Sequence, residues 1–246
     1  LKYFHLLEKT RELIYSSEQD GHNHLYLWDT RTGTVKNRIT QGDFVVRKVH
    51  YVDAQRRLVA FSASGMQPGR DPYLRALYVV GLDGRGLRCL TPEPADHLIS
   101  FSPDGSRFTD SMSRVDLPTV LSLHRSRNGA LLSVLERADT RYLDSLGYRP
   151  PTPFILPGPK GFDVHGLITL PFDFDPGRSY PVLDGTYTGP HTIRSPKTFS
   201  RAVINYEGDL SLAQLGFVVV TIDAKGTAFR SKPFHEASYQ NLGVGV

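Results

Sequence analysis

A tyrosine near the middle of the second half of the sequence is the side chain best placed to do chemistry. It lies in the stretch Tyr180 to Pro190, which reads YPVLDGTYTGP. The apolar start of this stretch predicts a strand, and the Gly-Pro pair predicts a turn after it. Tyr187 then follows the carboxyl end of a strand, where active sites form in α/β sheets, and its hydroxyl could donate a hydrogen bond to a developing oxyanion. The spacing alone favours a simpler arrangement, in which the ring packs at the turn and the hydroxyl meets water.

Other reactive groups do not form a recognisable motif. The sequence contains no G-x-S-x-G nucleophile motif, and Ser64, which precedes a glycine, lacks the first glycine of that pattern. His235-Glu236 begins like a zinc-protease motif, but position 239 is tyrosine rather than histidine. Cys89 is the only cysteine, so no internal disulfide can form and no Cys/His cluster has zinc spacing. We therefore predict no metal site and no cofactor, and interpret Cys89 as a small buried residue on a strand.

The elements that must position these residues begin with a series of short strands. Over the first 137 residues, runs of aromatic and β-branched residues end at Gly, Asp, Asn or Pro, and no helical period is sustained. The expected strands are 13–17, 25–28, 35–40, 45–52, 58–62 and 76–80.

These strands repeat with a period near 50 residues. Leu25 to Trp28 recurs as Leu77 to Val80, 52 residues later, and Ile39-Thr40 recurs as Leu90-Thr91, 51 residues later. A looser third copy opens at Phe101. Four strands at this period are typical of β-propeller blades, because one four-stranded sheet cannot bury both its faces without neighbours. We favour a partial propeller over a β-sandwich with chance similarity, although at about 50 residues per blade 137 residues make fewer than three blades.

The pattern of short, regularly spaced strands ends at about residue 137. Arg149 to Pro153 reads RPPTP, a proline-rich linker, and we place a domain boundary there, between 1–148 and 149–246. Beyond it, Phe162 to Leu170 predicts paired strands.

The end of the chain predicts a strand, helix, strand unit. Ser200 to Leu215 is expected to form a helix that ends at Gly216. Phe217 to Asp223 is then a continuous apolar run, typical of a strand buried on both faces in a parallel sheet. With the strand before Tyr187, this predicts a βαβ crossover and hence the beginning of an α/β domain.

Together these features resemble the prolyl oligopeptidase family and, within it, the dipeptidyl peptidase IV subfamily. Ser16 to Asp29 is similar to a late propeller blade of bacterial members, and Asp163 to Pro190 is similar to the start of their hydrolase domain. Gly216 to Thr227 (GFVVVTIDAKGT) resembles a strand and loop that usually read D-x-R-G-[ST], and Asn241 to Gly243 resembles the stretch shortly before the nucleophile. The resemblance implies a fold of class β plus α/β. Residues 1–148 would form about three C-terminal blades of a β-propeller, and 149–246 the N-terminal portion of an α/β-hydrolase domain.

The resemblance implies a serine exopeptidase that releases N-terminal dipeptides from peptide substrates through an acyl-enzyme. In this family a serine, an aspartate and a histidine form the triad. The residue that matches the family's oxyanion-hole tyrosine is Tyr187. No residue here matches the nucleophile, the acid or the triad histidine, so we expect an internal piece of a larger peptidase that is inactive by itself.

Several residues of suitable type are not given catalytic roles. His165, His191 and His235 are interpreted as surface or turn residues. The family binds the substrate amino terminus with a pair of glutamates, and the acidic residues near the start of this sequence, Glu8, Glu12 and Glu18, do not form that pair. Two positions depart from the family pattern: Lys225 replaces the usual arginine and cannot reproduce its bidentate hydrogen bonds, and Thr188 follows Tyr187 where a small residue is commoner.

Composition excludes other classes of function. The net charge of +4 is dispersed and forms no basic arm for nucleic acid, and no run of about 18 apolar residues predicts a membrane span. Two alternatives to a dipeptidyl peptidase stay open, a non-catalytic interaction protein of the same architecture and a related acylaminoacyl peptidase or esterase. The resemblance also implies a possible homodimer of the parent protein, and a periplasmic or cytoplasmic location in a bacterium.

Overall fold

The computed structural model describes residues 3–158, 161–187, 191–204 and 207–240. The chain forms two compact units. The first comprises Leu1–Met112, Leu121–Leu135 and Phe229–Pro233, and the second comprises Ser113–Val120, Glu136–Ala228 and Phe234–Val246. Our boundary between residues 148 and 149 stays a prediction from the sequence.

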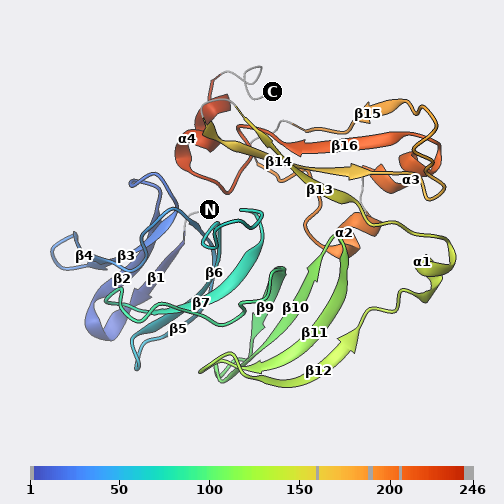
Figure 1. The fold of residues 1–246 in the computed structure, drawn as a ribbon. Coiled ribbons are helices and arrows are strands. Elements are labelled where there is room, and N and C mark those ends of the chain that lie inside the picture. Colours follow the sequence, from blue (N-terminus) through green and yellow to red (C-terminus); the bar gives the residue numbers. More distant parts are fainter. Residues whose placement is uncertain (1–2, 159–160, 188–190, 205–206, 241–246) are drawn as a thin grey trace. The chain divides into compact units, whose positions relative to one another are not determined.

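Three four-stranded sheets follow one another between residues 4 and 137, and in each the strands are neighbours in sequence order (Figure 1). The first two sheets are antiparallel. The first contains β1 (Phe4–Leu7), β2 (Glu12–Ser17), β3 (His24–Asp29) and β4 (Thr34–Arg38), with the 3₁₀ turn η1 (Glu8–Thr10) between β1 and β2. The second contains β5 (Val45–Asp53), β6 (Leu58–Ser64), β7 (Arg75–Gly81) and β8 (Arg88–Cys89). The third contains β9 (Asp96–Phe101), β10 (Arg107–Arg114), β11 (Leu117–Arg125) and β12 (Leu131–Arg137).

All six expected strands are present, each within a few residues of its predicted bounds. The estimate of fewer than three blades was too low, because the repeats are not all 50 residues long: the three sheets begin at residues 4, 45 and 96, and the third ends at residue 137. The third strands of the sheets, β3, β7 and β11, begin at residues 24, 75 and 117.

The repeated pairs Ile39-Thr40 and Leu90-Thr91 have the same structural role in two sheets. The Leu25 N–H donates to Thr40 Oγ1 at 2.9 Å, and the Leu77 N–H donates to Thr91 Oγ1 at 2.8 Å. In both sheets the residue before the threonine donates its N–H to the same leucine carbonyl at 2.8 Å. In both sheets the threonine hydroxyl therefore accepts a hydrogen bond from the third strand, just beyond the last residue of the fourth strand.

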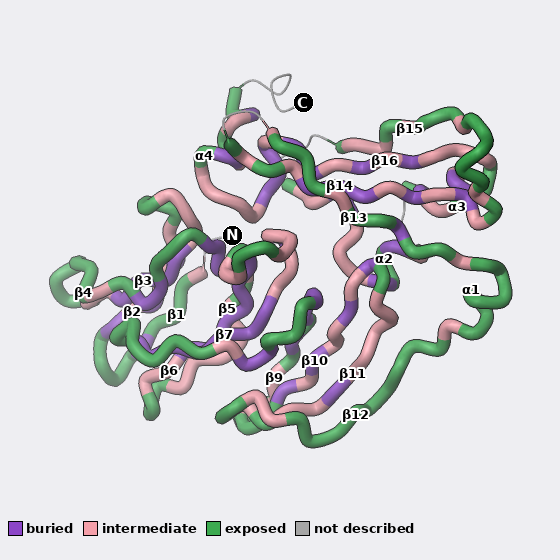
Figure 2. Tube along the Cα trace, viewed as in Figure 1, coloured by how far each residue is buried: buried purple, intermediate pink, exposed green. Residues whose placement is uncertain are grey.

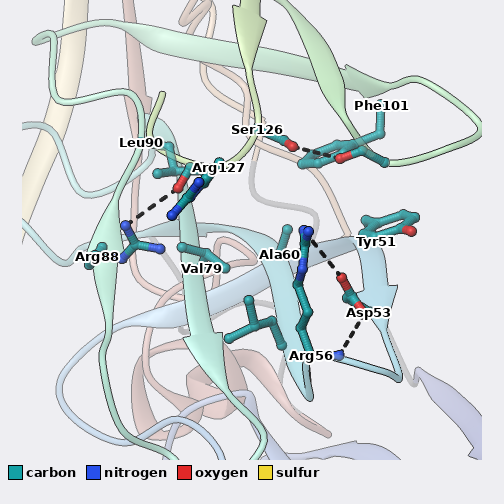
Figure 3. A pocket seen from close by; sticks show the side chains of 12 residues that line it. Tyr51, Asp53, Arg56, Ala60, Val79, Arg88, Leu90, Phe101, Ser126 and Arg127 are labelled. Atoms are coloured by element: carbon teal, nitrogen blue, oxygen red, sulfur yellow. Dashed lines mark hydrogen bonds and ion pairs between the residues drawn. The ribbon is translucent and has the colours of Figure 1, made fainter. Parts of the chain in front are cut away.

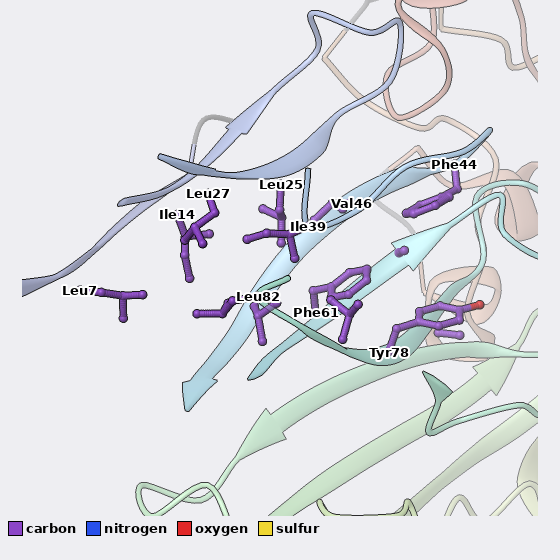
Figure 4. Packing of buried hydrophobic residues seen from close by; sticks show 14 residues of the cluster. Leu7, Ile14, Leu25, Leu27, Ile39, Phe44, Val46, Phe61, Tyr78 and Leu82 are labelled. Atoms are coloured by element: carbon purple, nitrogen blue, oxygen red, sulfur yellow. The ribbon is translucent and has the colours of Figure 1, made fainter. Parts of the chain in front are cut away.

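Apolar side chains fill the spaces between successive sheets, as the blade interpretation requires. One buried cluster combines residues of the first sheet, such as Ile14 and Leu25, with residues of the second, such as Phe61 and Tyr78 (Figure 4). A second cluster joins the second sheet to Ile99 and Phe108 of the third. The third sheet ends at β12, all of whose residues are exposed (Figure 2).

The second unit contains a mixed sheet in the order β13-β14-β16-β15. Its strands are β13 (Thr152–Pro157), β14 (Asp163–Thr169), β15 (Val182–Asp184) and β16 (Val218–Asp223). β14 runs antiparallel to both β13 and β16, whereas β15 runs parallel to β16. The helices are α1 (Arg141–Ser145), α2 (Phe199–Val203), α3 (Asp209–Gln214) and α4 (Lys232–His235), and η3 (Glu236–Ser238) is a 3₁₀ turn. Because α2 and α3 lie between the parallel strands β15 and β16, the predicted crossover is confirmed.

Three details differ from the sequence prediction. The single helix over 200–215 is wrong: Gly208, at φ 73°, precedes a separate helix α3, and the left-handed region that this glycine occupies cannot continue a helix. The proline-rich linker contributes Thr152 and Pro153 to β13, where proline is tolerated because β13 is an edge strand. β16 is not fully buried on both faces, since buried and half-buried residues alternate along it. The predicted helix end at Gly216 is confirmed, with φ 96° and its N–H donating to Ala213 O at 2.9 Å.

Candidate functional site

Tyr187 lies three residues beyond the carboxyl end of β15, as the sequence predicts for a residue at a strand end. The Gly185 N–H donates to Val220 O at 2.8 Å, which continues the pairing with β16, and the Thr186 N–H donates to Asp184 Oδ1 at 2.9 Å. The Tyr187 side chain is 48% exposed and lines a cavity of about 550 Å³. Its ring meets His191 edge to face, with ring centroids 5.7 Å apart. The hydroxyl is therefore carried by a strand end and is open to a ligand.

A buried ion pair lies in the wall of the same cavity. Arg194 donates to both carboxylate oxygens of Asp209, Nη1 to Oδ2 at 2.9 Å and Nη2 to Oδ1 at 2.5 Å. Both side chains are about 5% exposed. Burial lowers the pKa of Arg194, but the hydrogen bonds and charge of Asp209 outweigh it, so that the pKa is raised. This two-pronged hydrogen bonding holds the segment around residue 194 against α3.

Asp223, at the carboxyl end of β16, anchors the same segment. Its Oδ1 accepts hydrogen bonds from the N–H groups of Arg194 at 2.7 Å and Ser195 at 3.1 Å. Lys197 Nζ lies 3.0 Å from its Oδ2. The segment after His191 is thus fixed to the carboxyl end of β16, because the fully buried carboxylate of Asp223 accepts two backbone hydrogen bonds and pairs with an ammonium group.

Gly185 is required by this arrangement. A Cβ at this position would lie 2.9 Å from Arg194 Nη2 and 3.2 Å from Thr221 Cγ2. Only glycine allows the end of β15 to approach the ion pair this closely. Sequence reasoning singled out the loop that contains Gly185 but missed Arg194 and Asp209, since no motif or fixed spacing relates them.

The histidines differ in their environments. His165 was predicted at the surface or in a turn, but this is wrong: it is 7% exposed on β14, a central strand that is paired on both sides. His191 lies at an exposed turn, as predicted, and His235 is half-buried at the end of α4. Cys89 lies on strand β8, as predicted, but is only half-buried, and burial raises the pKa of its thiol.

The loop after β16 places Lys225 against an aromatic ring. Its Nζ lies 5.7 Å from the centroid of Phe162, within the range of a cation–π contact. The next residue, Gly226, has φ 105° and donates its N–H to Phe234 O at 2.9 Å. Thr188 and the stretch Asn241 to Gly243, which contributed to the resemblance, lie outside the described residues.

The first unit has a cavity of its own between the second and third sheets, about 420 Å³ in volume (Figure 3). Its apolar floor includes Ala60 and Val79, and the stacked rings of Tyr51 and Phe101 form one side. Arg56 pairs with Asp53 at its rim. In the part of the chain that the structure describes, no three His, Cys, Asp or Glu side chains gather to hold a metal ion, and no helix is long and apolar enough to cross a membrane.

Comparison with known proteins finds dipeptidyl peptidases that are similar to this chain. Residues 1–119 match the family described as the dipeptidyl peptidase IV N-terminal region. The crystal structure of Porphyromonas gingivalis dipeptidyl peptidase 4 is similar to 98% of this chain, with a TM-score of 0.80 and 29% sequence identity. The chain is dipeptidyl peptidase IV-like. A partial β-propeller followed by the beginning of an α/β-hydrolase domain, the fold class predicted from the sequence, is the fold of this segment.

Curated relatives of this dipeptidyl peptidase IV-like chain include peptidases from animals and fungi. Dipeptidyl peptidase 8 of Homo sapiens is 29% identical over 216 residues, which is 83% of this chain and 23% of that protein. The probable dipeptidyl peptidase 4 of Aspergillus flavus is 26% identical over 243 residues, which is 96% of this chain and 30% of that protein. The bacterial enzyme is matched over 33% of its length. The chain therefore spans a quarter to a third of the relatives that it matches.

Proposed function

We propose that this chain is the propeller-to-hydrolase segment of a serine exopeptidase that releases dipeptides from the amino terminus of peptides. The observation that carries the proposal is the position of Tyr187, whose exposed side chain lines a cavity beyond the carboxyl end of a parallel strand. The likeness to enzymes named dipeptidyl peptidases supports the substrate class.

Tyr187 stabilises charge in this proposal. When a serine hydroxyl attacks the scissile carbonyl, the carbonyl oxygen becomes negatively charged as the tetrahedral intermediate forms. A phenol O–H directed at that oxygen lowers the barrier, because the hydrogen bond is stronger to the oxyanion than to the neutral carbonyl. The serine, aspartate and histidine of the triad come from residues that this sequence does not contain, so the chain alone is expected not to hydrolyse peptides.

Arg194, Asp209 and Asp223 position the segment beside Tyr187. Asp223 accepts a hydrogen bond from the Arg194 N–H, and Asp209 accepts two from the Arg194 guanidinium. We assign them a positioning role, in which the buried ion pair keeps the cavity open next to the tyrosine ring.

The test is Tyr187→Phe in a protein that carries this chain together with a complete triad. We expect the turnover of a Gly-Pro or Ala-Pro chromogenic substrate to fall by about 10²-fold or more, with KM and the thermal midpoint little changed. Tyr142→Phe is the matched control, because Tyr142 is an exposed tyrosine on α1, outside the cavity. An unchanged turnover in Tyr187→Phe would remove the tyrosine from the oxyanion hole.

Two further expectations accompany the proposal. Hydrolysis of the same substrates by the 246-residue chain alone, inhibited by a serine-directed phosphonate, would contradict the assignment of the triad to other residues. The homodimer implied by the resemblance is tested by sedimentation of the complete protein at increasing concentration, where a purely monomeric species would contradict it.

A further inference from the structure

The first unit contains a second cavity, about 550 Å³ in volume, between its second and third sheets. Residues of β5, β6 and β7 form one side, and residues of β9, β10 and β11 form the other. Phe229, which belongs to the same compact unit, also lines it. Three cationic side chains face this cavity: Arg47, Lys48 and Arg75.

Arg47 is a half-buried cation that forms no ion pair with a carboxylate among the described residues. Its Cζ lies 3.6 Å from the centroid of the Phe229 ring. Its hydrogen bonds, to Ser64 Oγ and Tyr73 O, are both long at 3.4 Å. Burial, with the nearby charge of Arg75, lowers the pKa of Arg47 to about 10. Because removing a charge from water is costly unless the charge is paired, this partly desolvated guanidinium would gain from an anionic partner.

Asp96 and Tyr73 act on Arg47 in the opposite direction and raise its pKa, but they do not outweigh burial. The carboxylate of Asp96 is occupied by Arg75, whose Nε and Nη2 donate to it at 2.9 and 2.5 Å. His50 is neutral at pH 7, because burial and the charges of Lys48 and Arg75 lower its pKa to about 4, and its Nε2 lies 2.5 Å from Ser62 Oγ.

The remaining pair on the cavity wall is also internally matched. His97 Nδ1 lies 2.7 Å from Asp110 Oδ2, and both side chains are buried. Arg47 and Lys48 are therefore the two cations of the cavity wall that form no ion pair with a carboxylate among the described residues.

The rest of the wall combines hydroxyl groups with apolar surface. Ser100, Thr109 and Ser111 supply hydroxyls from the third sheet. Leu98, Ile99 and Leu121 supply apolar surface, and Leu98 is exposed. A ligand with one anionic end and an apolar body would match both parts.

We propose that this cavity binds a carboxylate carried on an apolar stem, with the guanidinium of Arg47 as its principal partner and Lys48 as a second cation. A guanidinium presents two parallel N–H donors that match the two oxygens of a carboxylate. The Phe229 ring lies against the guanidinium, whose Nη1 makes only two long hydrogen bonds within the chain.

The test measures binding of three probes to the 246-residue chain by titration calorimetry or ligand-observed NMR. The probes are N-acetyl-leucine, its uncharged amide N-acetyl-leucinamide, and inorganic phosphate. We expect N-acetyl-leucine to bind with saturation, the amide to bind at least tenfold more weakly, and phosphate to compete with lower affinity. Equal affinity for acid and amide, or no saturable binding by any probe, would overturn the proposal. Phosphate bound more tightly than N-acetyl-leucine would overturn the carboxylate assignment and indicate a phosphate site instead.

Variants connect the binding to Arg47. Arg47→Gln should weaken N-acetyl-leucine binding by about tenfold or more. Arg56→Gln is the control, because Arg56 is an exposed arginine at the other cavity, and it should bind as the unmodified chain does. If Arg47→Gln does not fold, Lys48→Gln, at an exposed position, is expected to bind more weakly and to lose part of the salt dependence. Unchanged affinity in the folded variants would overturn the assignment.

Discussion

The buried carboxylate of Glu12 should make the first unit sensitive to acid. Glu12 lies on β2 and is 2% exposed. It accepts hydrogen bonds from Lys36 Nζ at 2.5 Å and from Arg57 Nη1 and Nη2 at 2.7 and 3.1 Å. Since Arg57 lies between β5 and β6, this carboxylate ties the first sheet to the second. The hydrogen bonds of Arg57, assisted by Lys36 and opposed by burial, lower its pKa from 4.5 to about 2.

The size of the effect follows from that shift. A fall of the pKa by about 2.5 means that Glu12 contributes on the order of 3 kcal/mol to the free energy of unfolding, at about 1.36 kcal/mol for each unit of pKa. Because the pKa is depressed in the folded state, this stabilisation is fully present above pH 4.5, the ordinary pKa of a glutamate. It is lost as the pH falls towards the folded-state pKa of about 2.

Denaturant unfolding of Glu12→Gln tests this reasoning. The variant should be less stable than the unmodified chain by on the order of 3 kcal/mol at pH 7, and the two should converge near pH 2. The partner cations are each more than 40% exposed, so water solvates them once the carboxylate is removed. Asp139→Asn, which breaks an exposed pair with Arg141, is the control and should leave the free energy of unfolding unchanged. A stability difference that is the same at every pH, or that is absent at pH 7, would refute the argument.

Two further predictions concern positions elsewhere in the chain. Gly166→Ala should lower the free energy of unfolding by about 1–3 kcal/mol, because its Cβ would lie 2.6 Å from Thr221 O and press on the Phe154 ring; an unchanged unfolding midpoint would contradict this. Burial lowers the pKa of His97, but its hydrogen bond to Asp110 and the charge of that residue outweigh burial, so the pKa is raised. The resulting stability is complete below pH 6.5 and is lost as the pH rises through the folded-state pKa of His97. Asp110→Asn should remove this pH dependence in unfolding experiments, and a variant that keeps the original slope above pH 6.5 would show that another group is responsible.

The positions of the strands and of Tyr187 followed from the sequence because they depend on local patterns. Short runs of aromatic and β-branched residues between turn formers predicted β2 to β7, because such side chains favour the extended backbone of a strand. The period near 50 residues predicted sheets that cover one another, because a single four-stranded sheet leaves apolar faces exposed. The Gly-Pro turn after an apolar run placed Tyr187 at a strand end, where the structure has it.

Sequence patterns were less informative where local preference competes with context. The apolar spacing of 200–215 predicted one helix, but the backbone at Gly208 adopts a left-handed conformation and two short helices result. His165 was expected at the surface, although β14 is a central strand whose neighbours cover it. Neither outcome can be derived from the residues next to these positions.

Only the tertiary structure decided which distant charges meet. Glu12 and Arg57 are 45 residues apart, and Arg194 is 29 residues from Asp223. Arg47 reaches Phe229 from the opposite end of the chain. Strands and helices have fixed periods that can be recognised in a sequence. The stacking of one sheet on another imposes no fixed sequence spacing on the residues that it brings into contact. The sequence by itself therefore determined the strands, the repeat and the position of the tyrosine, whereas the packing of the folded chain determined the ion pairs behind that tyrosine and the unpaired cation in the first unit.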